Sequence, residues 1–173
     1  QRQMFIRDRN NFVSVVKSKE FGNLCIYFIS KVNCRYEVVN YLNTDYDLII
    51  NVQADEPLIN PKQIDKIIDS FKVCPDDIIS LAKEISSKNE IHNPNTVKVN
   101  FNKEMFATDF YRDVKKESLN YYKHIGVYAF KKGILQKICA LNPSENELNL
   151  KLEQLRWMDN NCLLYTSDAA DDL

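Results

Sequence analysis

Glycine is scarce in this 173-residue chain, which contains only Gly22, Gly126 and Gly133. α/β proteins that grip phosphate groups usually do so with a glycine-rich loop, because only glycine lets several backbone N–H groups crowd around a phosphate. The sequence has no such loop. Either the protein is not a nucleotide enzyme, or the segment that holds the nucleotide phosphates is absent from this sequence.

Other features that are missing exclude other classes of protein. No Lys/Arg-rich run is present and the net charge is −1, so we expect no nucleic-acid partner. The longest apolar runs are far shorter than the ~20 residues that span a bilayer, so we expect no membrane insertion. The cysteines form no C-x-x-C pair and are odd in number, which is typical of reduced thiols in a cytosolic protein. They are Cys25, Cys34, Cys74, Cys139 and Cys162.

The two ends of the chain differ from its middle. Residues 1–9, QRQMFIRDR, have no amphipathic period, and residues 164–173, LYTSDAADDL, finish in acidic sequence. Both resemble translated sequencing-linker text, and we exclude them from fold reasoning. Ordinary disordered termini are the alternative. Residues 10–163 then form one domain, which at 45% hydrophobic residues overall is large enough for a core.

The first half of this domain shows strand–helix alternation. The β-branched run 47–53 predicts a strand buried on both faces. Asn60-Pro61 is a helix start, and Ile64, Ile67, Ile68 and Phe71 follow as one apolar stripe. Cys74-Pro75 ends that helix, and residues 78–82 read as a second strand.

The second half continues the alternation. Residues 96–100 and 105–111 predict a hairpin, 123–130 a strand and 133–141 a short helix. Ser144 and Glu147 form a capping box that opens a last helix. We expect its buried face to carry Leu148, Leu152 and Leu155. The alternation predicts a layered α/β sheet.

Three stretches carry candidate site residues. Asp55 and Glu56 follow the strand that ends at Gln53, where ligands of open α/β sheets bind, and a carboxylate there suits Mg²⁺. A solvated acidic loop near a helix start explains them equally well. In HIGVYAF, His124 and Tyr128 share one strand face, and Gly126 between them leaves room for a ligand; a structural histidine is the alternative. In KLEQLRW, Glu153 and Gln154 lie beside the leucine stripe, or are ordinary helix-surface residues.

Four motifs together resemble one family. NVQADEPLI, NPNTVKV, HIGVYAF and LEQLRW occur in this order, and at similar spacing, in the 3-deoxy-manno-octulosonate (Kdo) cytidylyltransferases, also called CMP-Kdo synthetases. The resemblance covers about residues 51–158. It implies a three-layer α/β nucleotide-diphospho-sugar transferase (Rossmann-like) fold. It also implies a cytoplasmic homodimer that converts CTP and Kdo into CMP-Kdo and pyrophosphate for lipopolysaccharide synthesis.

The resemblance also implies roles for single residues. Asp55 corresponds to the catalytic Mg²⁺ ligand, while Gln53 and Ala54 lie close to the nucleotide. The positions that shape the sugar-acid pocket are His124, Tyr128, Glu153 and Gln154, together with Arg112, whose sequence context departs from the family. Asn95 and Lys98 correspond to mainly structural positions.

Two departures from the family pattern matter. The first strand with its Arg/Lys-bearing phosphate loop, and a second acidic metal ligand nearer the C-terminus, have no counterpart here. We therefore expect an incomplete sheet, with an apolar edge open beside the strand that ends at Gln53, and an inactive, aggregation-prone fragment. The rival interpretations are a cytidylyltransferase for another 2-keto sugar acid, and a truncated paralogue that only binds or dimerises.

Overall fold

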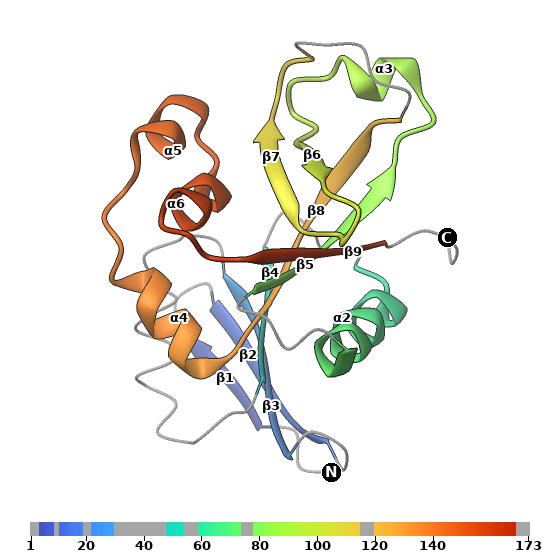
Figure 1. Ribbon diagram of the computed structural model, residues 1–173. Coiled ribbons are helices and arrows are strands. Elements are labelled where there is room, and N and C mark those ends of the chain that lie inside the picture. Colours follow the sequence, from blue (N-terminus) through green and yellow to red (C-terminus); the bar gives the residue numbers. More distant parts are fainter. Residues whose placement is uncertain are drawn as a thin grey trace. The chain divides into compact units, whose positions relative to one another are not determined.

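The computed structural model describes residues 4–8, 11–18, 22–29, 48–53, 59–73, 78–114 and 120–168. Contacts between Cα atoms divide the chain into two compact units. Unit 1 comprises Gln1–Asn60 and Gly126–Ala140, and unit 2 comprises Pro61–Ile125 and Leu141–Leu173. Figure 1 shows the elements along the chain.

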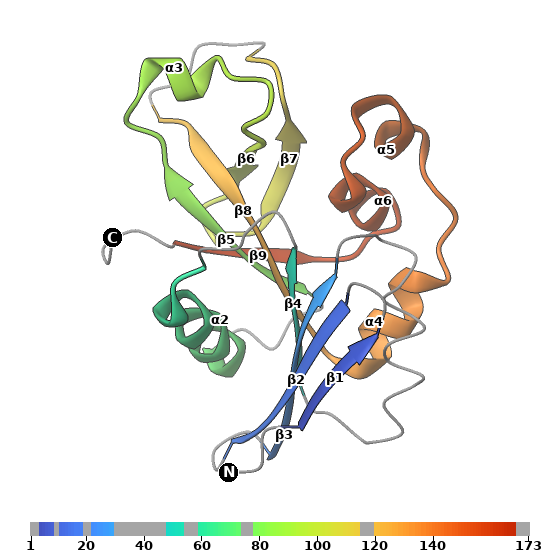
Figure 2. The ribbon, with the colours of Figure 1, turned by 180° about the vertical axis from the view of Figure 1, so that it is seen from behind.

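In its described residues, unit 1 consists of a sheet and one helix. Its strands lie in the order β1-β2-β3-β4-β8, and the last contributes only its second half. β3 and β4 are parallel, and the other neighbours in this unit are antiparallel. Figure 2 shows β1, β2 and β3 side by side. The elements are β1 (Met4–Asp8), β2 (Asn11–Ser18), β3 (Gly22–Ile29), β4 (Leu48–Gln53), β8 (Tyr122–Phe130) and α4 (Lys132–Cys139).

Strand β4 is the centre of unit 1. Residues Leu48 to Val52 are buried, as predicted for a strand with two covered faces. β4 pairs with β3 from Leu24↔Leu48 to Ile29↔Gln53 and with β8 on its other side. The expectation of an open edge beside β4 is therefore wrong. Residues Gly22–Ile29, for which the sequence pattern predicted no element, form the neighbour on that side.

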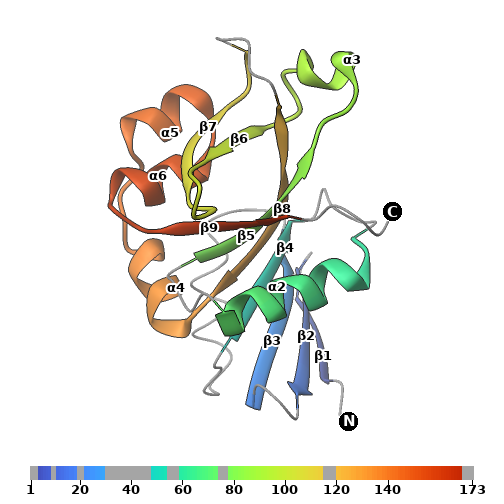
Figure 3. The same cartoon turned by 45° about the vertical axis from the view of Figure 1, so that its right-hand side comes forward.

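Unit 2 contains the other strands and helices of the described residues. β5 pairs with β9 in parallel, β6 pairs with β7 as the predicted hairpin, and β6 also pairs with the start of β8. Figure 3 shows α2 beside β5 and β9, which it contacts. The elements are α2 (Pro61–Val73), β5 (Ile78–Glu84), α3 (Lys88–Ile91), β6 (Lys98–Phe101), β7 (Ala107–Tyr111), α5 (Glu145–Leu150), α6 (Glu153–Asp159) and β9 (Leu164–Asp168).

The terminal residues that we excluded from fold reasoning include strands β1 and β9. Leu164–Asp168 runs beside β5, from Ile78↔Leu164 to Ala82↔Asp168. The linker origin of both ends stays a prediction.

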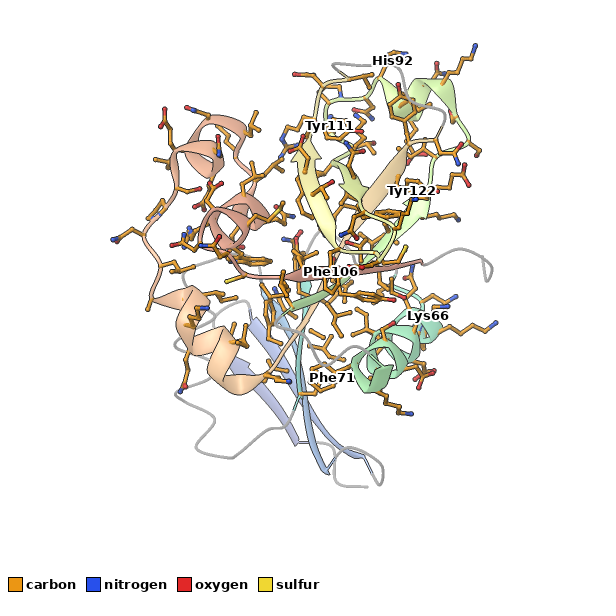
Figure 4. The ribbon with its side chains drawn as sticks, in the orientation of Figure 1. Lys66, Phe71, His92, Phe106, Tyr111 and Tyr122 are labelled. Carbon is orange, nitrogen blue, oxygen red and sulfur yellow. The ribbon has the colours of Figure 1, made fainter. Side chains whose placement is uncertain are left out.

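Helix α2 confirms the sequence prediction at both ends. It begins at Pro61 and ends at Val73, directly before Cys74-Pro75. Ile67 is fully buried, and the other stripe residues are half-buried. Figure 4 shows Lys66 on the outward side of this helix. No helix within the described ranges is both long enough and apolar enough to cross a membrane.

The predicted last helix is in fact two short helices. The capping box is present, since Ser144 Oγ accepts from the Glu147 N–H and Glu147 Oε2 accepts from the Ser144 N–H. Lys151 has a φ of 54°, which ends α5, and α6 then begins at Glu153. Because the chain turns there, Leu152 and Leu155 are buried but Leu148 is 65% exposed. The prediction of a buried Leu148 is wrong.

Candidate functional site

A buried polar cluster surrounds His124 in unit 2. Ser80 Oγ on β5 lies 2.8 Å from His124 Nε2, and Gln154 Nε2 on α6 lies 3.5 Å from His124 Nδ1. The Phe110 ring packs edge-on against the imidazole, with centroids 5.2 Å apart. Two residues singled out from the sequence, 30 positions apart, are thus brought together.

Burial sets the charge of this cluster. It lowers the pKa of His124 from its ordinary value of 6.5 to about 3. The imidazole is therefore neutral at physiological pH, with one ring N–H donor and one acceptor nitrogen. A neutral histidine beside a hydroxyl and an amide has the hydrogen-bonding chemistry that suits polar, uncharged groups such as sugar hydroxyls.

Helix α6 presents Glu153 and Gln154. Gln154 is buried, so its interpretation as a helix-surface residue does not hold, whereas Glu153 is half-buried. The helix is tied to α5 by a bidentate ion pair, in which Arg156 Nη2 and Nε lie 2.5 and 2.6 Å from the two Glu147 carboxylate oxygens. The pair is mostly buried, with side-chain exposures of 11% and 12%. The ion pair holds α6 against α5 and so limits the movement of the first turn of α6, which carries Gln154.

Arg112 follows β7 and contacts backbone carbonyls. Its guanidinium donates to the carbonyl oxygens of Pro94, Leu150 and Lys151 at 3.1 to 3.4 Å. These bonds fasten the turn between α5 and α6 to the loop before β6. The geometry gives Arg112 a clear structural task, while its predicted contact with the sugar acid stays a prediction.

Lys98 also has a structural role, as the resemblance of the chain to the family implied. The side chain is fully buried, and Nζ donates to the carbonyl oxygens of Asn93 at 2.7 Å and Arg112 at 2.6 Å. Burial lowers the pKa of this amine. It connects the loop before β6 with the end of β7.

Two predicted residues belong to unit 1. Tyr128 on β8 is fully buried, with its ring 6.0 Å from the Phe130 ring. Gln53 ends β4, and its Oε1 lies 2.5 Å from the point that a Cβ on Gly126 would occupy. The expected room beside Gly126 is therefore filled by Gln53. The side chain over this glycine comes from the neighbouring strand, which strand periodicity within β8 could not reveal.

Asp55, Ala54 and Glu56 lie outside the described residues, so their predicted roles stay predictions. Within the described ranges, no group of three or more His, Cys, Asp or Glu side chains could hold a metal ion. Ser80 is the member of the His124 cluster that sequence reasoning missed. Its one signal was a hydroxyl inside the otherwise apolar strand segment 78–82.

Comparisons with known proteins show the family to which the chain is similar. The family model described as "Cytidylyltransferase" matches residues 31–167. The 3-deoxy-manno-octulosonate cytidylyltransferase of Flavobacterium johnsoniae is 39% identical over 126 residues, covering 68% of this chain and 52% of the relative. The enzyme of the same name from Cytophaga hutchinsonii is 38% identical over 145 residues, covering 76% and 57%. The chain thus spans about half the length of these relatives.

Solved structures give the same fold. A structure of CMP:2-keto-3-deoxy-manno-octonic acid synthetase complexed with CTP matches with a TM-score of 0.73 at 29% identity, covering 82% of this chain and 61% of the other. A putative glucose-1-phosphate thymidylyltransferase from Bacillus anthracis matches with a TM-score of 0.51 at 13% identity, covering 78% and 50%. The second match is evidence for the fold alone.

Proposed function

Because the chain belongs to the cytidylyltransferase family, we propose that it forms part of an enzyme that transfers CMP from CTP to Kdo. The observation that carries this proposal is the likeness to a CMP-Kdo synthetase complexed with CTP, which extends over 82% of the chain. Relatives named for the same reaction, at 38% and 39% identity, support it.

The reaction joins two substrates in one displacement. The anomeric hydroxyl of Kdo loses its proton to solvent, and its oxygen attacks the α-phosphorus of CTP and forms a new P–O bond. The bond from that phosphorus to the bridging oxygen of pyrophosphate breaks, and pyrophosphate leaves with the electron pair. Phosphoryl transfer of this kind depends mainly on positioning and on neutralising phosphate charge.

Residues of this chain are assigned to positioning the two substrates. The neutral cluster of Ser80, His124 and Gln154 offers donors and acceptors without charge, which suits the hydroxyls of a sugar acid. Tyr128 and Glu153 belong to the same predicted pocket by resemblance. Gln53 and Ala54 are assigned to the nucleotide on the same ground.

Mg²⁺, the homodimer and the cytoplasmic location complete the proposal and rest on the resemblance. Asp55 is the carboxylate that would hold the ion. Bound Mg²⁺ supplies charge neutralisation at phosphate oxygens and is typically held by one or two carboxylates plus the substrate phosphates.

A cytidylyltransferase for another 2-keto sugar acid is the second candidate. The residues that separate the two candidates are those of the sugar-acid pocket. A fragment that only binds or dimerises is less well supported, because the two curated relatives described above are named as enzymes.

A chimera tests the proposed function independently of where this chain begins and ends. The segment of the Flavobacterium johnsoniae enzyme that aligns with this chain is replaced by the residues of this chain. Pyrophosphate release is then measured with CTP, Mg²⁺ and either Kdo or a neuraminate-type acid. We expect release with CTP and Kdo, and none when ATP replaces CTP.

The control is the same chimera with Asp55→Asn. This substitution keeps the size of the side chain but removes its charge, and we expect it to lower turnover by about a hundredfold or more. A chimera that binds CTP yet uses only the neuraminate-type acid supports the second candidate. A folded chimera that is inactive with every acid contradicts the proposal.

A further inference from the structure

We propose that Ser80 is a positioning residue that holds the Nε2–H tautomer of His124 and thereby makes Nδ1 a hydrogen-bond acceptor. Ser80 and His124 are 44 positions apart in the sequence and meet within the interior of unit 2. Ser80 is fully buried and His124 is 6% exposed.

The inference follows from the donors and acceptors around the imidazole. The Gln154 group 3.5 Å from His124 Nδ1 is the amide nitrogen, which can only donate. With the amide nitrogen in this place, Nδ1 is the acceptor, so the single proton of the neutral ring is assigned to Nε2. Nε2–H donates to Ser80 Oγ across 2.8 Å.

The hydroxyl proton of Ser80 completes the chain. Ser80 Oγ donates to the backbone carbonyl of Ile125 at 3.4 Å, which leaves an oxygen lone pair for His124. The order of bonds runs from Gln154 through His124 and Ser80 to a carbonyl of β8. Reversing the Gln154 amide would put a proton on Nδ1 and reverse every donor in the chain.

The tautomer has a consequence for binding. The Nδ1 contact with Gln154 is long for a hydrogen bond, while the Nε2 contact with Ser80 is short. A ligand hydroxyl that donates to Nδ1 can therefore replace Gln154 more easily than one that must displace Ser80. This step rests on the proposed function, in which the ligand is the sugar acid.

Nuclear magnetic resonance tests the tautomer directly. The chain contains two histidines, His92 and His124, so a ¹H–¹⁵N correlation spectrum of the imidazoles of the 173-residue chain holds two ring systems. His92 is exposed, and His92→Asn assigns its signals. We expect protonated Nε2 and unprotonated Nδ1 for His124 at pH 7. A proton on Nδ1 overturns the proposal.

Substitutions at Ser80 test its role in holding the tautomer. Ser80→Ala removes the acceptor, and we expect a loss of the exchange-protected Nε2–H signal together with a shift of the Gln154 side-chain amide signals. Ser80→Thr keeps the hydroxyl and should restore both. If Ser80→Ala leaves the two sets of signals unchanged, Ser80 does not position His124. Ser80→Cys, which keeps a weak acceptor of similar size, supplies the comparison if Ser80→Ala fails to fold.

Kinetics of the active chimera add a second measurement. Ser80→Ala should raise the KM for the sugar acid about five- to tenfold, the effect of losing one neutral hydrogen bond. The KM for CTP should stay within twofold, and Ser80→Thr should recover the original KM. Equal rises in both KM values contradict a role specific to the acid. An inactive chimera overturns the proposed function alone, because the tautomer is measured without catalysis.

Discussion

Position 126 favours glycine because a side chain of the neighbouring strand lies where a Cβ would be. An added Cβ would lie 2.5 Å from Gln53 Oε1 and 3.1 Å from Gln53 Cδ. Gly126→Ala must therefore displace Gln53 from its place beside β8. We expect a loss of about 1–3 kcal/mol in the free energy of unfolding, measured by urea denaturation.

Gly133 provides the matched control in helix α4. An added Cβ there meets nothing within 4 Å. Because alanine is the better helix former, Gly133→Ala should raise the free energy of unfolding by up to about 1 kcal/mol. Equal effects of the two substitutions would contradict the steric explanation.

Burial of His124 predicts a pH-dependent stability. Because the pKa of His124 is about 3 in the folded protein and ordinarily 6.5, the unfolded chain binds a proton that the folded chain does not. The free energy of unfolding should fall by up to about 1.4 kcal/mol per pH unit as the pH drops from 6.5 towards 3. Urea denaturation at pH 6.5, 5.5 and 5.0 measures this slope before most carboxylates titrate.

Two substitutions separate the contribution of His124 to this pH dependence from the contributions of other titrating groups. His124→Gln removes the titrating ring. The change in the free energy of unfolding per pH unit between pH 6.5 and 5.0 should therefore be smaller in this variant, by up to the contribution of one bound proton, about 1.4 kcal/mol. His92 is exposed, and Figure 4 shows it at the outer edge of unit 2. His92→Gln should leave the slope unchanged; a change as large as that of His124→Gln would exclude burial as the cause.

At the scale of elements, the Glu147–Arg156 pair connects α5 with α6. Glu147 also accepts from the Ser144 N–H, so one carboxylate serves both the helix cap and the ion pair. Glu147→Gln leaves a mostly buried guanidinium without its counter-ion. We expect a loss of about 3 kcal/mol in the free energy of unfolding.

A double-mutant cycle isolates the pair. Glu147→Gln and Arg156→Gln together should cost less than the sum of the single substitutions, with a coupling of about 1–3 kcal/mol. The exposed pair of Asp69 and Lys72 on α2 is the control, and Asp69→Asn should change stability by less than about 1 kcal/mol. Additive single effects at Glu147 and Arg156 would show that the two helices are held by other contacts.

For the chain as a whole, we expect the pairing of β3 with β4 to protect the apolar edge of β4 from association with other chains. Deleting residues 1–29 removes β1, β2 and β3 and exposes the apolar edge of β4. Unpaired edges of this kind associate with other chains. We expect the shortened chain to elute from a size-exclusion column as aggregates.

Deleting residues 1–8 is the control. It removes only the terminal strand β1 and leaves β4 paired on both sides. This variant should keep the elution volume of a single species. If both variants behave alike, β3 does not protect β4 in solution.

Signals within a few residues of each other were enough for the local structure. Pro61 begins a helix because its fixed φ suits the first helical position, and Ser144 caps one because Glu147 lies three residues later. The β-branched run at β4 and the hairpin of β6 and β7 follow from equally short patterns. The family also followed from the sequence, because four motifs in order are specific.

Only the tertiary structure decided which residues meet across the chain. Ser80 joins His124, Gln53 fills the space at Gly126, and β3 lies beside β4, and each contact links segments that are distant in sequence. Periodicity reports which face of an element is apolar, but it carries no information about which partner covers that face. Leu148 fits the apolar stripe of a continuous helix, yet the turn at Lys151 leaves it exposed, because burial depends on where the chain turns and what then packs against it.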